Sequence, residues 1–317
     1  MSEHQEINDV APSSLSHIIG QESVKAQVAV GLEAAFADNK KFDSALLVGP
    51  PGVGKSALAK IISLEMATEF HEVIGQSIKN TSDVNALLLA ASDKDVCHID
   101  EAHELPKEQQ TALYLAIDQK KLFIKGSKSK PTSIPINDFT LLLSTTDEYC
   151  LLQPLRDRMK LLLRFQFYTE EALTTLLKQR SANLGWSVDE AVLPLIAQRS
   201  RGTPRLALRM LQSCRRVCRS QGEKAIEPHH LATACVLEQI DLLGLGHVEQ
   251  HYLRILADGP NRLNVIASML GLPSRTVSQV TEPFLIRVGL MVKDDQGKRL
   301  LTEKGREHLA KSVTTDG

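Results

Sequence analysis

The sequence has few aromatic residues and no long apolar run, and each absence excludes a class of protein. Aromatic residues make up only 4% of the 317 residues, so aliphatic side chains have to form most of the core. No apolar run reaches the roughly 18 residues that identify a membrane-spanning helix. The polar, acidic start Met1–Ser16 does not resemble a signal peptide. We therefore expect a cytoplasmic protein with no membrane partner.

Net charge and paired cysteines are also lacking. The formal net charge is −1 at pH 7, so a nucleic-acid surface can only be a local patch and not a property of the whole chain. The cysteines are odd in number and lack the spacing of a zinc ribbon. They are Cys97, Cys150, Cys214, Cys218 and Cys235. We interpret all five as reduced core residues of a cytosolic protein.

The apolar pattern of the first half alternates between strands and helices. After a flexible arm at residues 1–15, strands buried on both faces are expected over 44–48, 95–99 and 139–144, and helices over 20–39, 58–66 and 111–118. This alternation predicts an α/β domain with a parallel sheet over residues 16–168. Two short strand-like runs, 122–124 and 133–136, flank the polar segment Lys125–Pro131 and predict a β-hairpin inserted at 120–138.

The second half is predicted to be helical and to end in a small module. Residues 169–242 contain four helical patterns and no strand, followed by a short linker. In residues 243–317, the turn Gly271–Pro273 separates two helices, and Ser274 can cap the second one. Two short strands follow. A helix-turn-helix with a hairpin is the outline of a winged helix, which is a DNA-binding module.

A glycine-rich segment, Gly49–Ser56, lies between a predicted strand and a predicted helix. It matches the phosphate-binding motif G-x-x-x-x-G-K-[ST] in full. The glycines allow backbone N–H groups to surround anionic oxygens at the start of the helix. We expect Lys55 to contact the β- and γ-phosphates of ATP, and Ser56 to bind Mg²⁺. The expected nucleotide contacts in this segment are Gly49, Gly52, Val53, Gly54, Lys55, Ser56 and Ala57.

Two acidic residues end the second buried strand. Asp100 suits the Mg²⁺ site, and Glu101 suits a base that polarises the attacking water. The run Asp100–His103 also spells the DEAH box of a helicase superfamily, but the rest of that layout is absent. We interpret His103 as a structural residue at a helix start and His98, in an apolar strand, as a core histidine.

These motifs together resemble the AAA+ ATPases, and more narrowly the RuvB family of Holliday-junction branch-migration motors. The resemblance extends from about Leu15 to Leu309. Its more specific features are Phe139–Leu142 with Ser144–Thr146, Pro154–Arg158, Phe165–Tyr168, Arg201–Arg205, and Glu282–Ile286 with Gly289. The implied fold is a P-loop AAA+ domain followed by an all-α lid and a C-terminal winged helix.

The resemblance also implies functional residues. Thr146 resembles the sensor 1 residue that reads the γ-phosphate, and Arg205 resembles sensor 2, which reaches that phosphate from the lid. Arg158 resembles the arginine finger that each subunit offers to the ATP of its neighbour, and Arg156 is a second candidate for it. Tyr168 resembles a residue that lines the nucleotide pocket.

Three further elements complete the implied site and its partner contact. Ile19–Gly20 resembles the segment near adenine, and Pro204 resembles another pocket residue. The hairpin at residues 122–136 resembles the one through which RuvB binds RuvA. Its apolar residues would bury themselves against that partner, and they are Leu122, Phe123, Ile124, Ile134 and Ile136.

The implied function is ATP-driven translocation of duplex DNA at four-way junctions, in recombination and repair, by a homohexameric ring acting with RuvA. Candidate DNA contacts in the winged helix are Arg275, Lys293, Lys298 and Arg299. Three departures from the family pattern are present, and the first is Ala11–Pro12 where the family usually has Arg-Pro. Sensor 1 continues into Asp147 where the family has arginine, and the wing carries less arginine than usual.

Two alternatives remain open. The chain could be an initiator-like or clamp-loader-like DNA-binding switch with slow, regulatory ATP hydrolysis, because such proteins share the P-loop, the lid and often a winged helix. It could also be an assembly partner that binds ATP without moving DNA, which the weakly basic wing favours. The hairpin and the motif Arg201–Arg205 favour the RuvB type.

Overall fold

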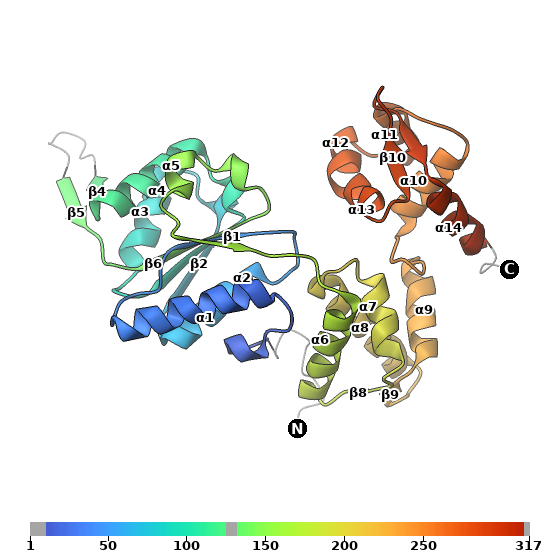
Figure 1. Cartoon of the computed structure of the whole chain (residues 1–317), viewed down its shortest axis with the longest axis horizontal. Helices are drawn as coiled ribbons and strands as arrows, with labels where there is room; N and C mark the ends of the chain where they lie inside the picture. Colours follow the sequence, from blue (N-terminus) through green and yellow to red (C-terminus); the bar gives the residue numbers. More distant parts are fainter. Residues whose placement is uncertain (1–10, 125–131, 314–317) are drawn as a thin grey trace. The chain divides into compact units, whose positions relative to one another are not determined.

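The computed structural model describes residues 11–124 and 132–313, which form two compact units (Figure 1). The first unit contains the chain up to Leu184 together with Thr203–Arg205, and the second contains Gly185–Gly202 and the chain from Leu206 onward. Residues 1–10 of the predicted arm and the predicted turn Lys125–Pro131 lie outside the described residues.

A parallel five-stranded sheet forms the centre of the first unit, with the strand order β2-β3-β6-β1-β7. The strands are β1 (Ala45–Val48), β2 (Phe70–Ile74), β3 (Val96–Asp100), β6 (Thr140–Thr145) and β7 (Leu161–Arg164). The sequence predicted the three central strands, and the sheet class is confirmed. The two missed strands are the edges of the sheet, where two of the five residues of β2 and two of the four residues of β7 are exposed.

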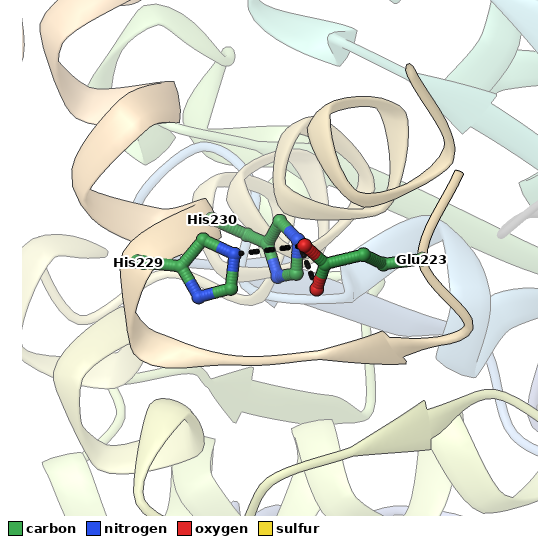
Figure 2. A group of neighbouring side chains, drawn as sticks. All are labelled: Glu223, His229 and His230. Carbon is green, nitrogen blue, oxygen red and sulfur yellow. Dashed lines mark ion pairs between the residues drawn. The ribbon is translucent and has the colours of Figure 1, made fainter. Parts of the chain in front are cut away.

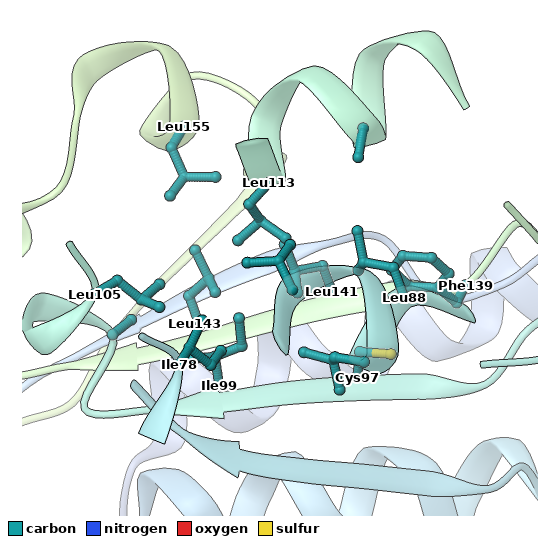
Figure 3. Packing of buried hydrophobic residues seen from close by; sticks show 14 of the residues in the cluster. Ile78, Leu88, Cys97, Ile99, Leu105, Leu113, Phe139, Leu141, Leu143 and Leu155 are labelled. Carbon is teal, nitrogen blue, oxygen red and sulfur yellow. The ribbon is translucent and has the colours of Figure 1, made fainter. Parts of the chain in front are cut away.

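Helices cover both faces of this sheet (Figure 1). The helices of this unit are α1 (Glu22–Ala37), α2 (Lys55–Met66), α3 (Thr81–Ala90), α4 (Lys107–Gln119), α5 (Gln153–Arg156) and α6 (Glu170–Asn183). In β6, Leu141 and Leu143 pack under α3 and α4, whereas Leu142 packs under α1 and α2. This alternation follows from the two-residue period of a strand, and Figure 3 shows the first of these clusters.

The cysteines divide between core and surface. Cys97, Cys214 and Cys218 are buried, as predicted, and burial raises the pKa of the Cys97 thiol to about 12. Cys235 is partly buried. The prediction was wrong for Cys150, which is exposed and lies in a short 3₁₀ turn where its thiol contacts Asp147 at 3.2 Å.

The predicted hairpin is present as β4 (Lys121–Ile124) and β5 (Thr132–Pro135), which pair antiparallel with Leu122 opposite Ile134. Leu122 is buried in the core of its own unit, and Ile136 packs against the same core. The expectation that Leu122 grips a partner is therefore corrected, because its side chain is already covered. The side chains of Phe123 and Ile124 lie outside the described residues.

The second unit consists of helices followed by a winged helix. Its first part contains α7 (Val192–Arg199), α8 (Pro204–Ser220), α9 (Pro228–Glu238) and the two-residue strands β8 (Ser187–Val188) and β9 (Ala225–Ile226). The winged helix contains α10 (His247–Ala257), α11 (Leu263–Leu270), α12 (Ser274–Thr276), a π-helical turn (Val277–Thr281), α13 (Glu282–Arg287), β10 (Met291–Lys293), β11 (Arg299–Leu301) and α14 (Glu303–Val313). Tyr252 and Leu285 lie in its core.

The linker predicted before the winged helix is a structured turn. One carboxylate oxygen of Asp241 accepts the N–H groups of Leu243 and Leu245 at 2.9 and 2.8 Å, and the other contacts His308 at 2.8 Å. Within the described parts of the chain, no helix combines the length and the apolar character that crossing a membrane requires.

Candidate active site

The phosphate-binding loop joins β1 to α2 and has the backbone that its motif predicts. Gly52 and Gly54 have φ values of 76° and 101°, in the left-handed region that favours glycine. The loop lies at the carboxyl edge of the sheet, and the N–H of Gly49 donates to Thr145 O at 3.2 Å. Helix α2 begins at Lys55, so its positive dipole end is directed at the loop.

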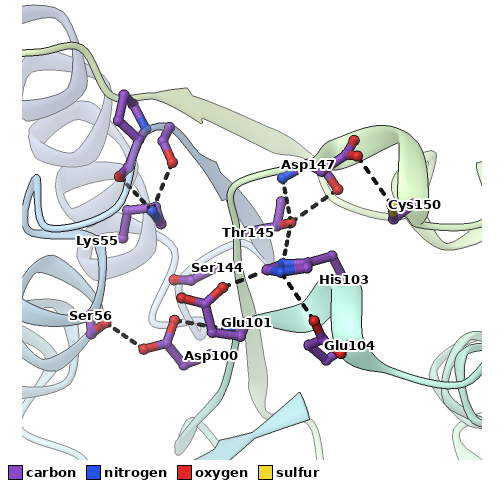
Figure 4. A network of polar contacts seen from close by, with 12 residues as sticks. Lys55, Ser56, Asp100, Glu101, His103, Glu104, Ser144, Thr145, Asp147 and Cys150 are labelled. Atoms are coloured by element: carbon purple, nitrogen blue, oxygen red, sulfur yellow. Dashed lines mark hydrogen bonds and ion pairs between the residues drawn. The ribbon is translucent and has the colours of Figure 1, made fainter. Parts of the chain in front are cut away.

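Lys55 is buried within this loop (Figure 4). Its ammonium group donates to Gly49 O and Pro50 O, both at 2.8 Å. Burial lowers the pKa of Lys55, and the charge of Arg205 acts in the same direction, whereas Glu101 and Asp100 oppose it. The ammonium group is therefore held at the centre of the loop, where the motif places a phosphate.

Two oxygen ligands for a divalent cation meet beside the loop. The hydroxyl of Ser56, in the first turn of α2, donates to Asp100 Oδ2 at 2.7 Å, and Asp100 ends β3. Adjacent ligands of an octahedral Mg²⁺ lie about 2.9 Å apart, as follows from Mg–O distances of about 2.0–2.1 Å. The pair therefore fits Mg²⁺ in both donor type and spacing. The N–H of Glu101 donates to Asp100 Oδ1 at 2.9 Å and fixes the carboxylate plane.

Glu101 lies next to this pair in a strained backbone conformation. Its φ is 49°, and for a residue other than glycine this left-handed conformation costs on the order of 1–2 kcal/mol. Its side chain is 43% exposed, and Oε2 lies 3.4 Å from His103 Nδ1. The carboxylate is thus accessible to water at the edge of the sheet, as a general base has to be.

Sequence reasoning did not anticipate the contacts that connect Glu101 to β6. His103 Nδ1 lies 3.2 Å from the hydroxyl of Thr145, which also exchanges hydrogen bonds with the backbone of Asp147 (Figure 4). Thr146, the predicted sensor 1 residue, is exposed and directly follows β6. The sequence feature that could have indicated these contacts is the position of Thr145 at the end of β6, which pairs with β3 in the sheet.

His98 is a core histidine, as predicted. It is fully buried in β3, where Nδ1 contacts Glu72 at 3.0 Å and Nε2 contacts the hydroxyl of Ser144 at 2.8 Å. Both ring nitrogens are therefore used within the sheet.

Arg205 and Tyr168 lie on two further parts of the first unit. The N–H of Arg205, in the first turn of α8, donates to Gly52 O in the phosphate-binding loop at 3.3 Å. Tyr168 borders a cavity of about 610 Å³, whose lining includes Ile19, Gly20, Gln166 and Ala172. The ring of Tyr168 lies against Gly20, and burial raises its pKa to about 12. The structure thus brings together the segments predicted to surround the base.

The two candidate arginine fingers lie after or within α5. Arg158 pairs with Asp118 of α4 and lies over the ring of Tyr114. Arg156 contacts Gln153 and lies 5.3 Å from the ring centroid of Tyr149.

The candidate DNA contacts of the winged helix differ in availability. Arg275 is exposed and contacts Gln279 at 2.9 Å, and Lys298 is partly exposed. Lys293 pairs with Glu282 at 2.8 Å. Arg299 is only 9% exposed and also pairs with Glu282, at 2.8 Å. The prediction that Arg299 contacts DNA is therefore corrected, because its guanidinium group is committed to a buried carboxylate.

A cluster of possible metal ligands in the second unit is structural instead. Glu223, His229 and His230 lie near the start of α9, and His230 Nε2 is 3.2 Å from Glu223 (Figure 2). The N–H of Glu227 donates to His230 Nδ1 at 2.9 Å, so this ring nitrogen is already used by the backbone at the start of α9. His230 also takes part in the reciprocal contacts with Glu227 that cap the start of α9, so at least this member of the cluster has a structural role.

Comparisons with known proteins match the whole order of domains. Residues 10–165 match the family described as the Holliday junction DNA helicase RuvB P-loop domain, residues 168–241 the RuvB AAA lid domain, and residues 242–310 the RuvB C-terminal winged helix domain.

Individual relatives agree over nearly their full length. The branch migration complex subunit RuvB of Kosmotoga olearia is 34% identical over 316 residues, which cover 98% of this chain and 92% of that protein. The corresponding subunit of Thermotoga maritima is 35% identical, with 95% and 92% covered. The solved structure of the Thermotoga maritima RuvB Holliday junction branch migration motor is similar with a TM-score of 0.81, at 33% identity, covering 95% of this chain and 98% of that one.

Proposed function

The chain belongs to the RuvB family, and we propose that it is an ATP-driven motor that moves duplex DNA during branch migration of Holliday junctions. The observation that supports this most directly is the joint position of Lys55, Ser56, Asp100 and Glu101 at one edge of the sheet. These residues supply the parts of a site for ATP hydrolysis, in a chain that ends in a winged helix.

The phosphate-binding loop would hold the nucleotide through backbone N–H groups and Lys55. Ser56 and Asp100 would hold Mg²⁺, and the ion would supply positive charge that stabilises phosphoryl transfer. Glu101 would accept a proton from the attacking water. The 43% exposure of its side chain supports this assignment, because water can reach the carboxylate.

Three residues would sense the nucleotide or complete the site. Thr146, directly after β6, would read the γ-phosphate, and Arg205 would approach it from the start of α8. Arg158 would act on the ATP of the adjacent subunit. A residue that works across an interface requires head-to-tail assembly, and we propose a homohexameric ring.

The partner assignments extend this proposal. The winged helix would hold duplex DNA by its phosphates, with Arg275, Lys293 and Lys298 as contacts, and the hairpin β4–β5 would bind RuvA. Such phosphate contacts position a duplex without reading its sequence. We propose a cytoplasmic ATP-dependent DNA helicase with a large ATPase domain at 16–168, a lid at 169–242 and a winged helix at 243–317.

A second candidate is a DNA-binding switch with slow, regulatory hydrolysis. The specific observation in its favour is that Glu282 neutralises positive charge in the wing through Lys293 and Arg299. A weaker hold on DNA suits a switch better than a motor.

The motor and the regulatory switch are distinguished by comparing the wild type with the Glu101→Gln variant in assays of ATP hydrolysis and of junction movement. We expect ATP hydrolysis in the presence of duplex DNA and RuvA to fall at least about 100-fold, because a general base contributes about that much. Migration of a synthetic four-way junction should stop, while nucleotide binding remains. Glu108→Gln, on the exposed face of α4, is the matched control. If the wild-type protein hydrolyses ATP at a rate that duplex DNA does not change, and it moves no junction, the proposed motor function is refuted.

A further inference from the structure

The side chain of Arg158 is held in a defined position by its own subunit. Its Nε donates to Asp118 Oδ1 at 2.6 Å, its Nη2 pairs with Asp118 Oδ2, and its Nη1 donates to Pro154 O at 2.5 Å. The guanidinium carbon lies 4.9 Å from the ring centroid of Tyr114. Tyr114 and Asp118 are four residues apart on α4 and therefore share one face of that helix.

These contacts use one edge of the guanidinium group and leave another. An arginine has five N–H donors in a planar fork. The carboxylate of Asp118 takes the edge formed by Nε and Nη2, and Pro154 takes one N–H of Nη1. In the part of the chain that the structure describes, these acceptors leave two donors, one on each terminal nitrogen. Arginine binds phosphates through such terminal N–H groups, and the side chain of Arg158 is 27% exposed.

We propose that Asp118 is a positioning residue for catalysis, and that it holds the terminal N–H pair of Arg158 ready for the γ-phosphate of the adjacent subunit's ATP. This inference rests on the proposed function of Arg158 as an arginine finger. A flexible arginine loses rotamer freedom when it engages a phosphate, and that loss slows the reaction. Fixing the side chain on Asp118 and Tyr114 before ATP arrives removes most of the loss from the hydrolysis step.

The electrostatics of the pair agree with this arrangement. The hydrogen bond from Arg158 lowers the pKa of the Asp118 carboxyl, so Asp118 is ionised at neutral pH and both of its oxygens accept. The opposite inference is that Asp118 sequesters the finger, and the direction of the change in kcat distinguishes the two.

The test uses the full-length chain assembled with duplex DNA. We expect Asp118→Ala and Asp118→Asn to lower kcat for ATP hydrolysis about 100-fold, the cost of misplacing a reacting group by about 1 Å. KM for ATP should stay within about twofold, because the proposed role of Asp118 is to position Arg158 and not to bind the nucleotide in its own phosphate-binding loop. Asp118→Glu should restore part of the rate. Asp157→Asn is the matched control, because Asp157 is an exposed neighbour whose side chain contacts Gln153.

Mixed rings show whether Asp118 acts through the finger. Asp118→Ala subunits have an intact phosphate-binding loop, and Lys55→Ala subunits have an intact finger, so a mixture should recover hydrolysis. That recovery also shows that the Asp118→Ala subunit is folded. The double variant Asp118→Ala/Arg158→Ala should be no slower than Arg158→Ala.

Two failures are distinguishable. If Arg158→Ala subunits are not complemented by Lys55→Ala subunits, the proposed finger is wrong and the inference about Asp118 falls with it. If Arg158→Ala subunits are complemented but Asp118→Ala has the wild-type kcat, the positioning inference alone is wrong. A higher kcat in Asp118→Ala would also overturn it, because Asp118 would then compete with phosphate for Arg158.

Discussion

Replacing Glu282 with alanine should destabilise the winged helix by about 3–5 kcal/mol, because the change leaves a buried arginine without its counter-charge. The side chain of Glu282 is 0% exposed. Its carboxylate accepts from Tyr252 at 3.0 Å and pairs with Arg299 and Lys293, each at 2.8 Å. All of these groups belong to the second unit, so the prediction does not depend on nucleotide or on assembly.

The three partners of Glu282 contribute unequally to the predicted loss of stability. Lys293 is 42% exposed and can turn into solvent when the carboxylate is removed. Arg299 is nearly buried, and without Glu282 it would keep its contact with Gly297 O at 2.7 Å and its interaction with the hydroxyl of Tyr252, neither of which supplies a counter-charge. The hydroxyl of Tyr252 would also lose its partner, at a cost of about 1–3 kcal/mol for a buried group. We therefore assign most of the loss to Arg299 and Tyr252.

Urea denaturation of the second unit, followed in the full-length chain by circular dichroism, measures the effect. Asp295→Ala, in the exposed turn of the wing, is the control and should change stability by less than about 0.5 kcal/mol. Glu282→Ala and Arg299→Ala should also couple, with an interaction energy of about 0.5–3 kcal/mol in the double variant. A loss below about 1 kcal/mol for Glu282→Ala would match an exposed pair and refute the reasoning.

The same carboxylate predicts a dependence on pH. Burial by itself raises the pKa of Glu282, but hydrogen bonds from Arg299, Lys293 and Tyr252 outweigh burial and lower the pKa below its ordinary value. The unfolded chain then binds the proton more readily. The contribution to stability is fully present above the unfolded pKa of about 4.3 and is lost as pH falls through the lower folded value. Glu282→Gln should remove this part of the acid dependence.

Two further changes test the active site and the DNA surface. A Cβ on Gly75 would lie 2.5 Å from the carbonyl oxygen of Glu101, so Gly75→Ala should displace the carboxylate that we propose as the general base. We expect kcat for ATP hydrolysis to fall by about 100-fold, and an unchanged kcat in a steady-state assay would contradict this. Arg275→Ala and Lys298→Ala should each reduce the slope of log K for duplex DNA against log salt by about 0.9. Arg299→Ala should leave that slope unchanged, and a reduced slope in a folded Arg299→Ala variant would restore this residue as a DNA contact.

The central strands could be predicted because a strand that is buried on both faces consists mainly of apolar residues. Strands β1, β3 and β6 are covered on both faces and read as continuous apolar runs. Strands β2 and β7 lie at the two edges of the sheet and are partly exposed. His71 and Glu72 interrupt the apolar pattern of β2, and the short apolar run of β7 ends at Arg164. The pairing order of a sheet also depends on contacts between distant segments, such as β1 with β6 and β7, and no local pattern specifies these.

The ATP site and the DNA surface differed in predictability for a physical reason. The phosphate-binding loop is a local backbone structure, and Ser56 meets Asp100 because neighbouring parallel strands end at the same edge of a sheet. A charged side chain on the winged helix acts on DNA only if no closer carboxylate neutralises it, and its partner can lie far away in the sequence. Glu282 precedes Arg299 by 17 residues, and Asp118 precedes Arg158 by 40. The number of lysine and arginine residues in the wing is therefore an upper bound on the positive charge that can contact DNA. Buried ion pairs, such as Arg299 with Glu282, reduce that charge.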